Sequence, residues 1–380
     1  MRIALGIEMN IGYYRGTLRG VARYARTRKG WHLNQQGPTV EGLQWLKRRN
    51  PDALIIGGAS VEILKSVASW GIPVVNVGKS FPEVRLPKVS NDEVAIGVMA
   101  AEYFFGRGYR HFGYAGHGGN IQDGRGVSFE QRLRELQIHC SAFADPAWPE
   151  DERKSEANSA AFNEWLNGLE KPAAIFCHND HRAWMLAEQC QALGLEVPRE
   201  IAILGVDNDV TVCSLSDPPL SSIQTASERI GYEAARLLES LLNGDVNTSN
   251  PPPLPPLRVV QRRSTEALCS DDETVSRALH YMQEHLLREE GVEALTKRMA
   301  CSRRSFERRF LEATGSTPAH TWTKFRIAEA QRLLAETSLT IDQISQLTGF
   351  SDGNHLSTTF RKQTRLTPAQ FRKRSQLARE

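Results

Sequence analysis

Apolar residues in the first two thirds of the chain alternate between short continuous runs and stretches with helical spacing. Six short runs are predicted to form buried strands, and six amphipathic stretches among them are predicted to form helices. The strands are residues 3–7, 53–56, 74–77, 112–115, 174–177 and 201–206, and the helices are residues 17–28, 40–49, 61–70, 93–107, 181–193 and 227–242. Strands separated by helices at this spacing predict an α/β fold of parallel sheets with right-handed crossovers.

The last third of the chain repeats one pattern. In each copy a short apolar-periodic helix ends in a small residue, and a serine and a second helix follow. Four residues of the first copy recur fifty positions later: Phe310, Thr317, Pro318 and Ala319 return as Phe360, Thr367, Pro368 and Ala369. The repeat predicts an all-α domain with two helix-turn-helix units, residues 292–312 and 341–362.

Residue types at the turns support this interpretation. Ala300 and Gly349 stand where a bulky side chain would collide with the facing helix. Ser302 and Ser351 can accept from the free N–H groups that open the next helix. In each second helix an apolar pair four residues apart is predicted to face inward and to leave the other side free. These pairs are Phe306 with Phe310 and Leu356 with Phe360.

A connecting helix is predicted over residues 317–336, opened by Thr317 and Pro318. At 1.5 Å per residue it is on the order of 25 to 30 Å long. Successive major-groove faces of B-DNA are ~34 Å apart. A rigid pair of units can therefore read neighbouring groove segments from one side of a duplex.

Charge is unevenly spread along the chain. Residues 292–380 hold 16 Lys and Arg against 8 Asp and Glu, a net charge of +8, whereas residues 1–270 hold 29 against 30. Because the excess lies on the segment with groove-reading geometry, we interpret it as a phosphate-binding surface rather than a solvated face.

Composition limits the cellular compartment and the kinds of catalytic or metal site that the chain can be expected to have. The six cysteines form no Cys-x-x-Cys pair and no histidine pairing at metal spacing, which favours free thiols in a reducing cytoplasm. No run approaches eighteen apolar residues, so no membrane span is predicted. No catalytic residue, metal site or cofactor is predicted. Gly78-Lys79-Ser80 lacks the leading glycine of a phosphate loop, because position 73 is proline. Cys177, His178 and His181 beside Asp180 leave a metal or thiol site as the alternative to a strand end with an aspartate N-cap.

The repeated region resembles the DNA-binding domain of AraC-type transcription regulators. The residues that carry the match are Ile344, Ser345, the run 349–352, the run 360–362, Thr367, Pro368, Phe371 and Arg372. The resemblance covers about residues 273–375. Arg365 replaces the glycine usual before Thr-Pro, which Gly315 keeps in the first copy, and His355-Leu356 replaces a usual aromatic pair.

Residues 1–265 resemble the sugar-responsive core of LacI-type regulators and periplasmic binding proteins, in which two α/β lobes clasp a small ligand. The motifs occur in order at residues 89–97, 108–116, 174–183, 194–198, 205–208 and 219–223. The resemblance implies an effector domain of residues 1–266, a linker of residues 267–272 and a DNA-binding domain of residues 273–380. It also implies a crossing between lobes near residues 116–119 and a return near Ser221 and Ser222. A LacI-like lobe pair joined to an AraC-type domain is similar to the subgroup of xylose regulators.

The candidate DNA-binding residues are the solvent-facing positions of the two second helices. Arginine can bind guanine O6 and N7 bidentately and glutamate can accept from cytosine N4, while Thr359 and Lys362 are better suited to phosphate. The candidates are Arg303, Arg304, Glu307, Arg308, Asn354, His355, Ser357, Thr358, Thr359 and Lys362.

The candidate effector-binding residues follow strands at the end of the sheet where ligands of parallel sheets bind. Asp207 and Asp180 can each accept from two vicinal hydroxyls, and Asn179 offers both a donor and an acceptor. Tyr13 can stack on a sugar face, and Arg125 is a donor from the second lobe. The alternative roles are helix capping for Asp180 and a turn for Asp207.

The sequence therefore predicts a cytoplasmic regulator that binds a double-stranded DNA operator and responds to a small sugar, xylose or a related pentose. A homodimer is expected, and RNA polymerase is a possible further partner. Two alternatives stay open. One is a sugar-processing α/β enzyme fused to a DNA-binding domain, and the other is a DNA binder that responds to no ligand.

Overall fold

The computed structural model describes residues 1–116, 124–143, 155–244, 250–266, 272–285, 292–364 and 366–377. The chain divides between Glu266 and Ala267 into two compact units, each with its own core. Of the predicted linker, only Asp272 falls within the described residues. No described helix is long and apolar enough to cross a membrane.

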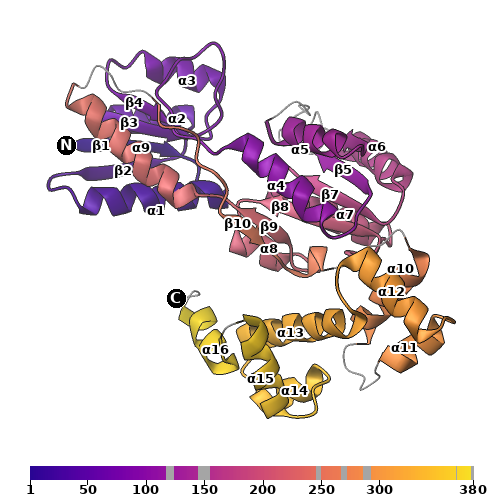
Figure 1. Ribbon diagram of the computed structural model, residues 1–380. Helices are drawn as coiled ribbons and strands as arrows, with labels where there is room; N and C mark the ends of the chain where they lie inside the picture. The colour runs from indigo at the N-terminus through magenta and orange to yellow at the C-terminus, as the bar shows by residue number, and fades with distance from the viewer. Residues whose placement is uncertain are drawn as a thin grey trace. The chain divides into compact units, whose positions relative to one another are not determined.

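The first sheet of the N-terminal unit has four parallel strands in the order β2-β1-β3-β4. They are β1 (Arg2–Ile7), β2 (His32–Gln36), β3 (Ala53–Gly57) and β4 (Val74–Asn76). Successive side chains of a strand point to opposite faces. Ile3 and Leu5 therefore pack with α1 (Gly12–Arg26) and α9 (Ser227–Leu242), whereas Ala4 packs with α2 (Val40–Lys47) and α3 (Val61–Ala68). Figure 1 shows this sheet with its helices as the first lobe.

The second sheet has six strands in the order β10-β9-β8-β7-β5-β6. Its strands are β5 (His111–Ala115), β6 (Cys140–Phe143), β7 (Ala173–Cys177), β8 (Ile201–Val206), β9 (Ser221–Gln224) and β10 (Arg258–Val260). All neighbours are parallel except β10, which is antiparallel to β9. The helices of this lobe are α4 (Glu93–Phe105), α5 (Gly124–Glu135), α6 (Ser155–Gly168), α7 (Asp180–Ala192) and α8 (Val210–Leu215), followed by the 3-10 helix η2 (Arg263–Thr265).

The predicted first crossing between lobes is wrong, whereas the predicted return lies close to the observed one. Strand β5 already belongs to the second sheet, and α4 before it packs on α5, so the chain leaves the first lobe between β4 and α4 rather than near residues 116–119. Strand β9, which contains Ser221 and Ser222, is still in the second sheet. The return comes after it, since α9 packs on α1. A third crossing passes Leu254, which pairs with Asn91, and leads into β10.

The C-terminal unit is helical, as predicted. Its helices are α10 (Glu273–Glu284), α11 (Val292–Arg298), α12 (Arg303–Thr314), α13 (Pro318–Glu336), α14 (Ile341–Leu347), α15 (Gly353–Thr364) and α16 (Pro368–Leu377). The predicted inward pairs are confirmed, since Phe306, Phe310, Leu356 and Phe360 are fully buried.

Helix α13 belongs to both cores of this unit. Trp322 near its start packs into the core of α10, α11 and α12, while Leu333 and Leu334 near its end pack with α14 and α15. Thr317 caps its N-terminus by accepting from the N–H of His320, and Pro318 follows at the first helical position, as predicted. The two helix-turn-helix units therefore share one structural element (Figure 1).

All six predicted strands are present, together with β2, β6, β9 and β10. Strand β2, with the sequence His-Leu-Asn-Gln-Gln, lies at the edge of its sheet and is mostly half-exposed. An edge strand of this kind needs no continuous apolar run, so the hydrophobic pattern does not reveal it.

Candidate functional site

The loop that follows β8 places two carboxylates, Asp207 and Asp209, at the carboxyl end of that strand. Asp207 is the loop's first residue, with a backbone φ of +101° that L-residues other than glycine rarely adopt. Its N–H donates to the carbonyl of Ile223 on β9 at 2.9 Å. Burial raises the pKa of the Asp207 carboxyl, and the positive charge of Arg125 opposes that rise.

Asp207 has a buried oxygen without a protein partner. Among the described residues, no donor lies within hydrogen-bond distance of its Oδ1. Buried polar atoms in folded proteins are nearly always hydrogen-bonded, and an orphaned acceptor costs about 1–3 kcal/mol. An unpaired carboxylate oxygen at the end of a parallel strand is therefore suited to accept from a ligand hydroxyl.

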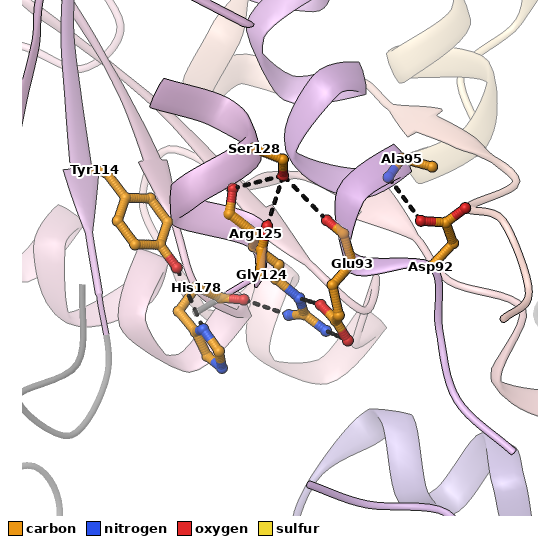
Figure 2. A network of polar contacts seen from close by, with 8 residues as sticks. All are labelled: Asp92, Glu93, Ala95, Tyr114, Gly124, Arg125, Ser128 and His178. Carbon is orange, nitrogen blue, oxygen red and sulfur yellow. Dashed lines mark hydrogen bonds and ion pairs between the residues drawn. The ribbon is translucent and has the colours of Figure 1, made fainter. Parts of the chain in front are cut away.

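Arg125 comes from the first turn of α5 and is buried, with 7% of its surface exposed. Its Nε donates to Glu93 Oε2, and its Nη1 donates to the carbonyl of His178 at 2.5 Å. Figure 2 shows the guanidinium held between these two groups. Burial works against the charge, but Glu93 and Asp207 outweigh it and raise the pKa of Arg125. The cation therefore persists beside Asp207.

A close crossing of α4 and α5 brings Glu93 to Arg125. A Cβ on Gly97 of α4 would lie 2.1 Å from Ser128 Oγ and 2.4 Å from the carbonyl oxygen of Arg125. Asp92 opens α4 by accepting from the N–H of Ala95 at 2.9 Å. The Ser128 hydroxyl meets carbonyl oxygens of both helices in Figure 2. Only glycine at position 97 allows this approach.

Tyr13 and Tyr14 lie on the first lobe near this charge. Their rings meet edge to face, with centroids 5.0 Å apart. Tyr13 is buried and its hydroxyl donates to the carbonyl of Val77 at 3.0 Å. Burial raises the pKa of both phenols, and Asp207 adds to each rise. Tyr13 therefore lies within electrostatic range of Asp207, but its hydroxyl is already used within the protein.

An ion pair that was not predicted joins the two lobes. Arg15 on α1 contacts Asp209 in the loop after β8, with Nη2 and Oδ2 2.5 Å apart. Gly12 lies equally near, since a Cβ there would be 2.6 Å from the Asp209 side chain. Asp209 also caps α8 by accepting from the N–H of Thr211. The loop of residues 207–209 therefore contacts both lobes.

Asp180 lies behind this loop. It is 2% exposed, and its Oδ2 accepts from the N–H of Asp209 at 2.7 Å. Burial, followed by the charge of Asp207, raises the pKa of Asp180 to about 8. The predicted N-cap role of Asp180 is wrong, because Asn179 caps α7 by accepting from the N–H of Arg182 at 2.8 Å. These contacts make Asp180 a support for the loop and commit the side-chain oxygen of Asn179 to the helix.

His178 was not chosen as an effector residue from the sequence. Its ring Nδ1 lies 3.3 Å from the hydroxyl of Tyr114 on β5. Figure 2 shows the two side chains facing one another, and His178 lies within electrostatic range of Asp207. The alternative metal site has no support in the described residues, where no group of three His, Cys, Asp or Glu is placed to hold an ion. Burial raises the pKa of the Cys177 thiol, which disfavours a thiolate nucleophile.

The first helix-turn-helix unit presents arginines on the exposed side of α12. Ser302 caps the helix by accepting from the N–H of Ser305, and Ala300 in the turn has a φ of 50°. Arg304 and Arg308 are exposed, and among the described residues no acid pairs with either. Arg303 instead pairs with Glu307 at 2.9 Å and approaches Glu293 at 3.6 Å.

One arginine of α12 has a structural contact. Arg309 donates through Nε and Nη2 to the two carboxylate oxygens of Asp272, each at 2.6 Å. Asp272 in turn caps α10 by accepting from the N–H groups of Thr274 and Val275, and the pKa of its carboxyl is lowered chiefly by Arg309. Arg309 therefore fastens α12 to α10.

The second unit exposes neutral polar side chains near the start of α15 and basic side chains in its last turn. Asn354, His355, Thr358 and Lys362 are exposed, and Ser357 and Thr359 are half-buried. The predicted cap Ser351 is wrong, because Asp352 accepts from the N–H of His355 at 2.8 Å, while Ser351 donates to Asp352. Gly349 takes the turn with a φ of 68°, as predicted. Arg365 lies outside the described residues.

Family comparisons match both parts of the chain. A model of the periplasmic binding protein-like domain matches residues 101–265, and a model of a helix-turn-helix domain matches residues 295–374. The chain joins a periplasmic-binding-protein-like domain to an AraC-type helix-turn-helix domain.

Relatives share both domains in full. The xylose operon regulatory protein of Escherichia coli strain K12 is 26% identical over 382 residues, which cover 98% of this chain and 96% of that protein. Its counterpart in Haemophilus influenzae is 25% identical over 390 residues, with 98% of each chain covered. A solved structure of the xylose-binding transcription activator xylR matches with a TM-score of 0.70 and 26% identity, over 98% of this chain and 97% of that one.

The periplasmic-binding-protein-like domain also holds the functional candidates that sequence reasoning missed. These are Tyr14, Arg15, Glu93, His178 and Asp209, which all interact with Asp207 or with its loop. Asp209 and His178 had a usable signal, since Asp209 lies two residues after Asp207 and His178 directly follows β7. Tyr14 and Arg15 depend on how the lobes meet, and Glu93 depends on how α4 crosses α5. No local pattern in the sequence encodes either arrangement.

Proposed function

We propose that this protein is a transcription regulator that binds duplex DNA through its AraC-type domain and responds to a sugar bound between its lobes. The sugar is D-xylose or a closely related pentose. The observation that carries the proposal is the orphaned, buried Oδ1 of Asp207, placed beside the Arg125 cation in a chain whose two domains match those of xylose regulators.

The charges around Asp207 suit a neutral polyol. A carboxylate accepts from vicinal hydroxyls, and a guanidinium donates to hydroxyl oxygens, in charge-assisted bonds about twice as strong as neutral ones. The Arg125 cation lies beside the two carboxylates of Glu93 and Asp207, so this part of the site has a small negative excess and disfavours an anionic ligand. Tyr13 and Tyr14 supply aromatic surface on the first lobe.

On DNA, Arg304 and Arg308 are the proposed base readers, because both are exposed and neither is held by an acid of the described chain. Asn354, His355 and Thr358 are proposed to read bases from α15, and Lys362 with Thr359 to contact phosphate. The proposal includes a homodimer in the cytoplasm and a possible contact with RNA polymerase. It assigns no catalytic role to either domain.

The test is DNA binding by the full chain with and without sugar. An operator is first selected from a random duplex library, and its affinity is then measured alone and with D-xylose, D-ribose, L-arabinose or D-glucose. Isothermal titration calorimetry gives the affinity of each sugar. We expect D-xylose or one other pentose to bind and to change the DNA affinity, and glucose to do neither.

Two results would contradict the proposal. If no sugar gives heat or a thermal shift while DNA still binds, the protein is a DNA binder that responds to none of them. If the bound sugar is consumed, as chromatography of the recovered ligand would reveal, the protein is an enzyme.

A further inference from the structure

The end of the N-terminal unit is bonded directly to the proposed sugar-binding loop. Residues 262–265, here called the exit segment, contain η2, the last element of the N-terminal unit, and they precede the C-terminal unit in the chain. The N–H of Arg262 donates to Ser221 Oγ at 2.7 Å, and that hydroxyl donates back to the Arg262 carbonyl at 2.8 Å. The exit segment is therefore hydrogen-bonded to strand β9 of the second sheet.

Two buried hydroxyls complete this attachment. Ser264 Oγ donates to the carbonyl of Ile203 on β8 at 2.6 Å and accepts from the N–H of Ser221 at 2.8 Å. Thr265 Oγ1 lies 2.7 Å from Ser221 Oγ and 2.7 Å from the hydroxyl of Tyr103 on α4. Ser264 and Thr265 are both 0% exposed, so water cannot replace these bonds.

The Arg262 side chain extends from the exit segment to the sugar-binding loop. Its Nη2 donates to Asn208 Oδ1 at 2.7 Å, and its Nη1 donates to the carbonyl of Leu220 at 2.8 Å. Asn208 is the residue between Asp207 and Asp209, and its N–H donates to Ser222 Oγ at 2.9 Å. A planar guanidinium with both ends engaged fixes the distance between the loop and the exit segment.

The loop itself holds an unusual backbone. Asp207 and Asn208 have φ values of +101° and +52°, so two successive residues adopt conformations that L side chains disfavour. Such a backbone persists only when its surroundings hold it. Asp180, Ser222 and Arg262 contact the loop from the second lobe, and Arg15 contacts it from the first. A ligand that contacts Asp207 will therefore alter the backbone at Asn208, and Arg262 is hydrogen-bonded to the Asn208 side chain.

We propose that Arg262, through its bond to Asn208, is the positioning residue that couples sugar binding at Asp207 to the chain leading to the DNA-binding domain. The inference rests on the proposed function and adds the route of regulation to it. A sugar can shift DNA affinity only if it favours one of two conformations of the protein. Because the Asn208–Arg262 bond ties the loop to the exit segment, a movement of the loop would also move the exit segment.

The experiment measures the coupling ratio, which is the DNA affinity of the full chain with saturating D-xylose divided by its affinity without sugar. Four proteins are compared: the wild type, Asn208→Gly, Arg262→Gln and the double variant. Glycine is chosen at position 208 because it removes the acceptor and tolerates the positive φ. The matched control is Arg263→Gln, which removes an equal charge from the neighbouring exposed residue. Thermal melting and D-xylose titration are recorded for every variant.

We expect the wild-type ratio to fall in the range of about 5- to 150-fold typical of allosteric proteins, and to approach 1 in both single variants. The double variant should be no worse than either single one, because both remove the same bond. D-xylose should still bind, and Arg263→Gln should keep the wild-type ratio.

The inference is overturned if Asn208→Gly and Arg262→Gln bind D-xylose and retain the wild-type ratio, even though the proposed function then stands. It is also overturned if Arg263→Gln lowers the ratio as much as Arg262→Gln, which would show that charge alone matters. If D-xylose and the other pentoses leave wild-type DNA affinity unchanged, the proposed function fails and the coupling role fails with it.

Discussion

The loop after β8 and the helix α12 both carry several charged side chains, but those around the loop are paired, whereas two on the helix are exposed and, among the described residues, unpaired. Around Asp207 the charges are buried or half-buried and occur in pairs, as Arg125 with Glu93 and Arg15 with Asp209. On α12, Arg304 and Arg308 stand exposed without an acidic partner in the described chain. Paired charge suits a small neutral ligand, whereas exposed cations suit a polyanion whose counterions they displace.

The two recognition helices show a smaller contrast of the same kind. Helix α12 offers arginines, although Arg303 and Arg309 are engaged by Glu307 and Asp272. Helix α15 offers an amide, an imidazole and hydroxyls at the corresponding surface. Arginine brings both affinity and guanine preference, so the two helices should divide the work unequally.

Salt should separate the two charged regions most strongly. If the AraC-type domain contacts ~4 phosphates, raising the salt concentration from about 50 to 200 mM should weaken DNA binding by ~100-fold. Sugar affinity should stay constant over the same range, because a neutral sugar displaces no counterions. Fluorescence anisotropy and calorimetry on one preparation make the comparison. DNA binding that is equally tight in both salts would refute the electrostatic interpretation of α12.

Removing the charge of Asp207 should weaken sugar binding and leave DNA binding in the absence of sugar unchanged. Alanine would add backbone strain at a φ of +101°, so Asp207→Asn is the cleaner change. We expect it to cost ~1.5 to 3 kcal/mol of sugar binding, the usual worth of a hydrogen bond to a charged group. Calorimetry measures the loss, and Asp217→Asn in the exposed loop after α8 is the control. An unchanged sugar affinity would remove Asp207 from the site.

Replacing one residue on each recognition helix tests their division of labour. Arg304→Ala should cost ~1 to 3 kcal/mol of operator binding and relax base preference at one position, while Asn354→Ala costs less. Affinities are measured on the selected operator and on its single-base changes. If Asn354→Ala is more damaging, α15 is the principal reader. If Arg304→Ala weakens all sequences equally, Arg304 contacts phosphate.

The buried charge should also give a pH signature that exposed charge does not. The pKa of Asp180 rises from 3.8 to about 8 on folding, so the folded state holds a proton that the unfolded chain has lost. The free energy of unfolding of the wild type should therefore fall, relative to Asp180→Asn, as pH rises from about 4 to 8, by at most ~1.4 kcal/mol per unit. Urea unfolding at pH 5, 6, 7 and 8 measures it. A constant difference would mean that Asp180 is ionised throughout.

The helix-turn-helix units could be predicted in detail because the residues that define each unit are close in sequence and the pattern occurs twice. Fully buried pairs four residues apart and a glycine at the turn follow directly from residue type. The cap of α15 was missed by one residue, since Ser351 and Asp352 are both capping types and adjacent. Neighbouring residues of equal propensity cannot be ranked without the backbone.

The effector site could be predicted only where a residue follows a strand. Asp207 satisfies that rule, whereas Glu93 and Arg15 reach the site from other elements. The role of Glu93 depends on which sheet α4 covers, and the role of Arg15 depends on how the lobes meet; a helical pattern encodes neither. The misplaced crossing near residue 116 has the same origin, because the polar stretch before α4 gives no sign that the chain changes lobe there.

Helix α13 sets a torsional constraint on any operator. Because Trp322 is fixed in one core and Leu333 in the other, the two recognition helices cannot adjust their spacing independently. B-DNA turns by roughly 34 to 36° with each base pair, given its ~10 to 10.5 pairs per turn. One extra pair between the two contacted segments would rotate one of them out of phase with its helix. The DNA must then bend or untwist to restore contact, or one recognition helix no longer contacts its bases. The number of base pairs between the two contacted segments is therefore specified as strictly as the bases themselves.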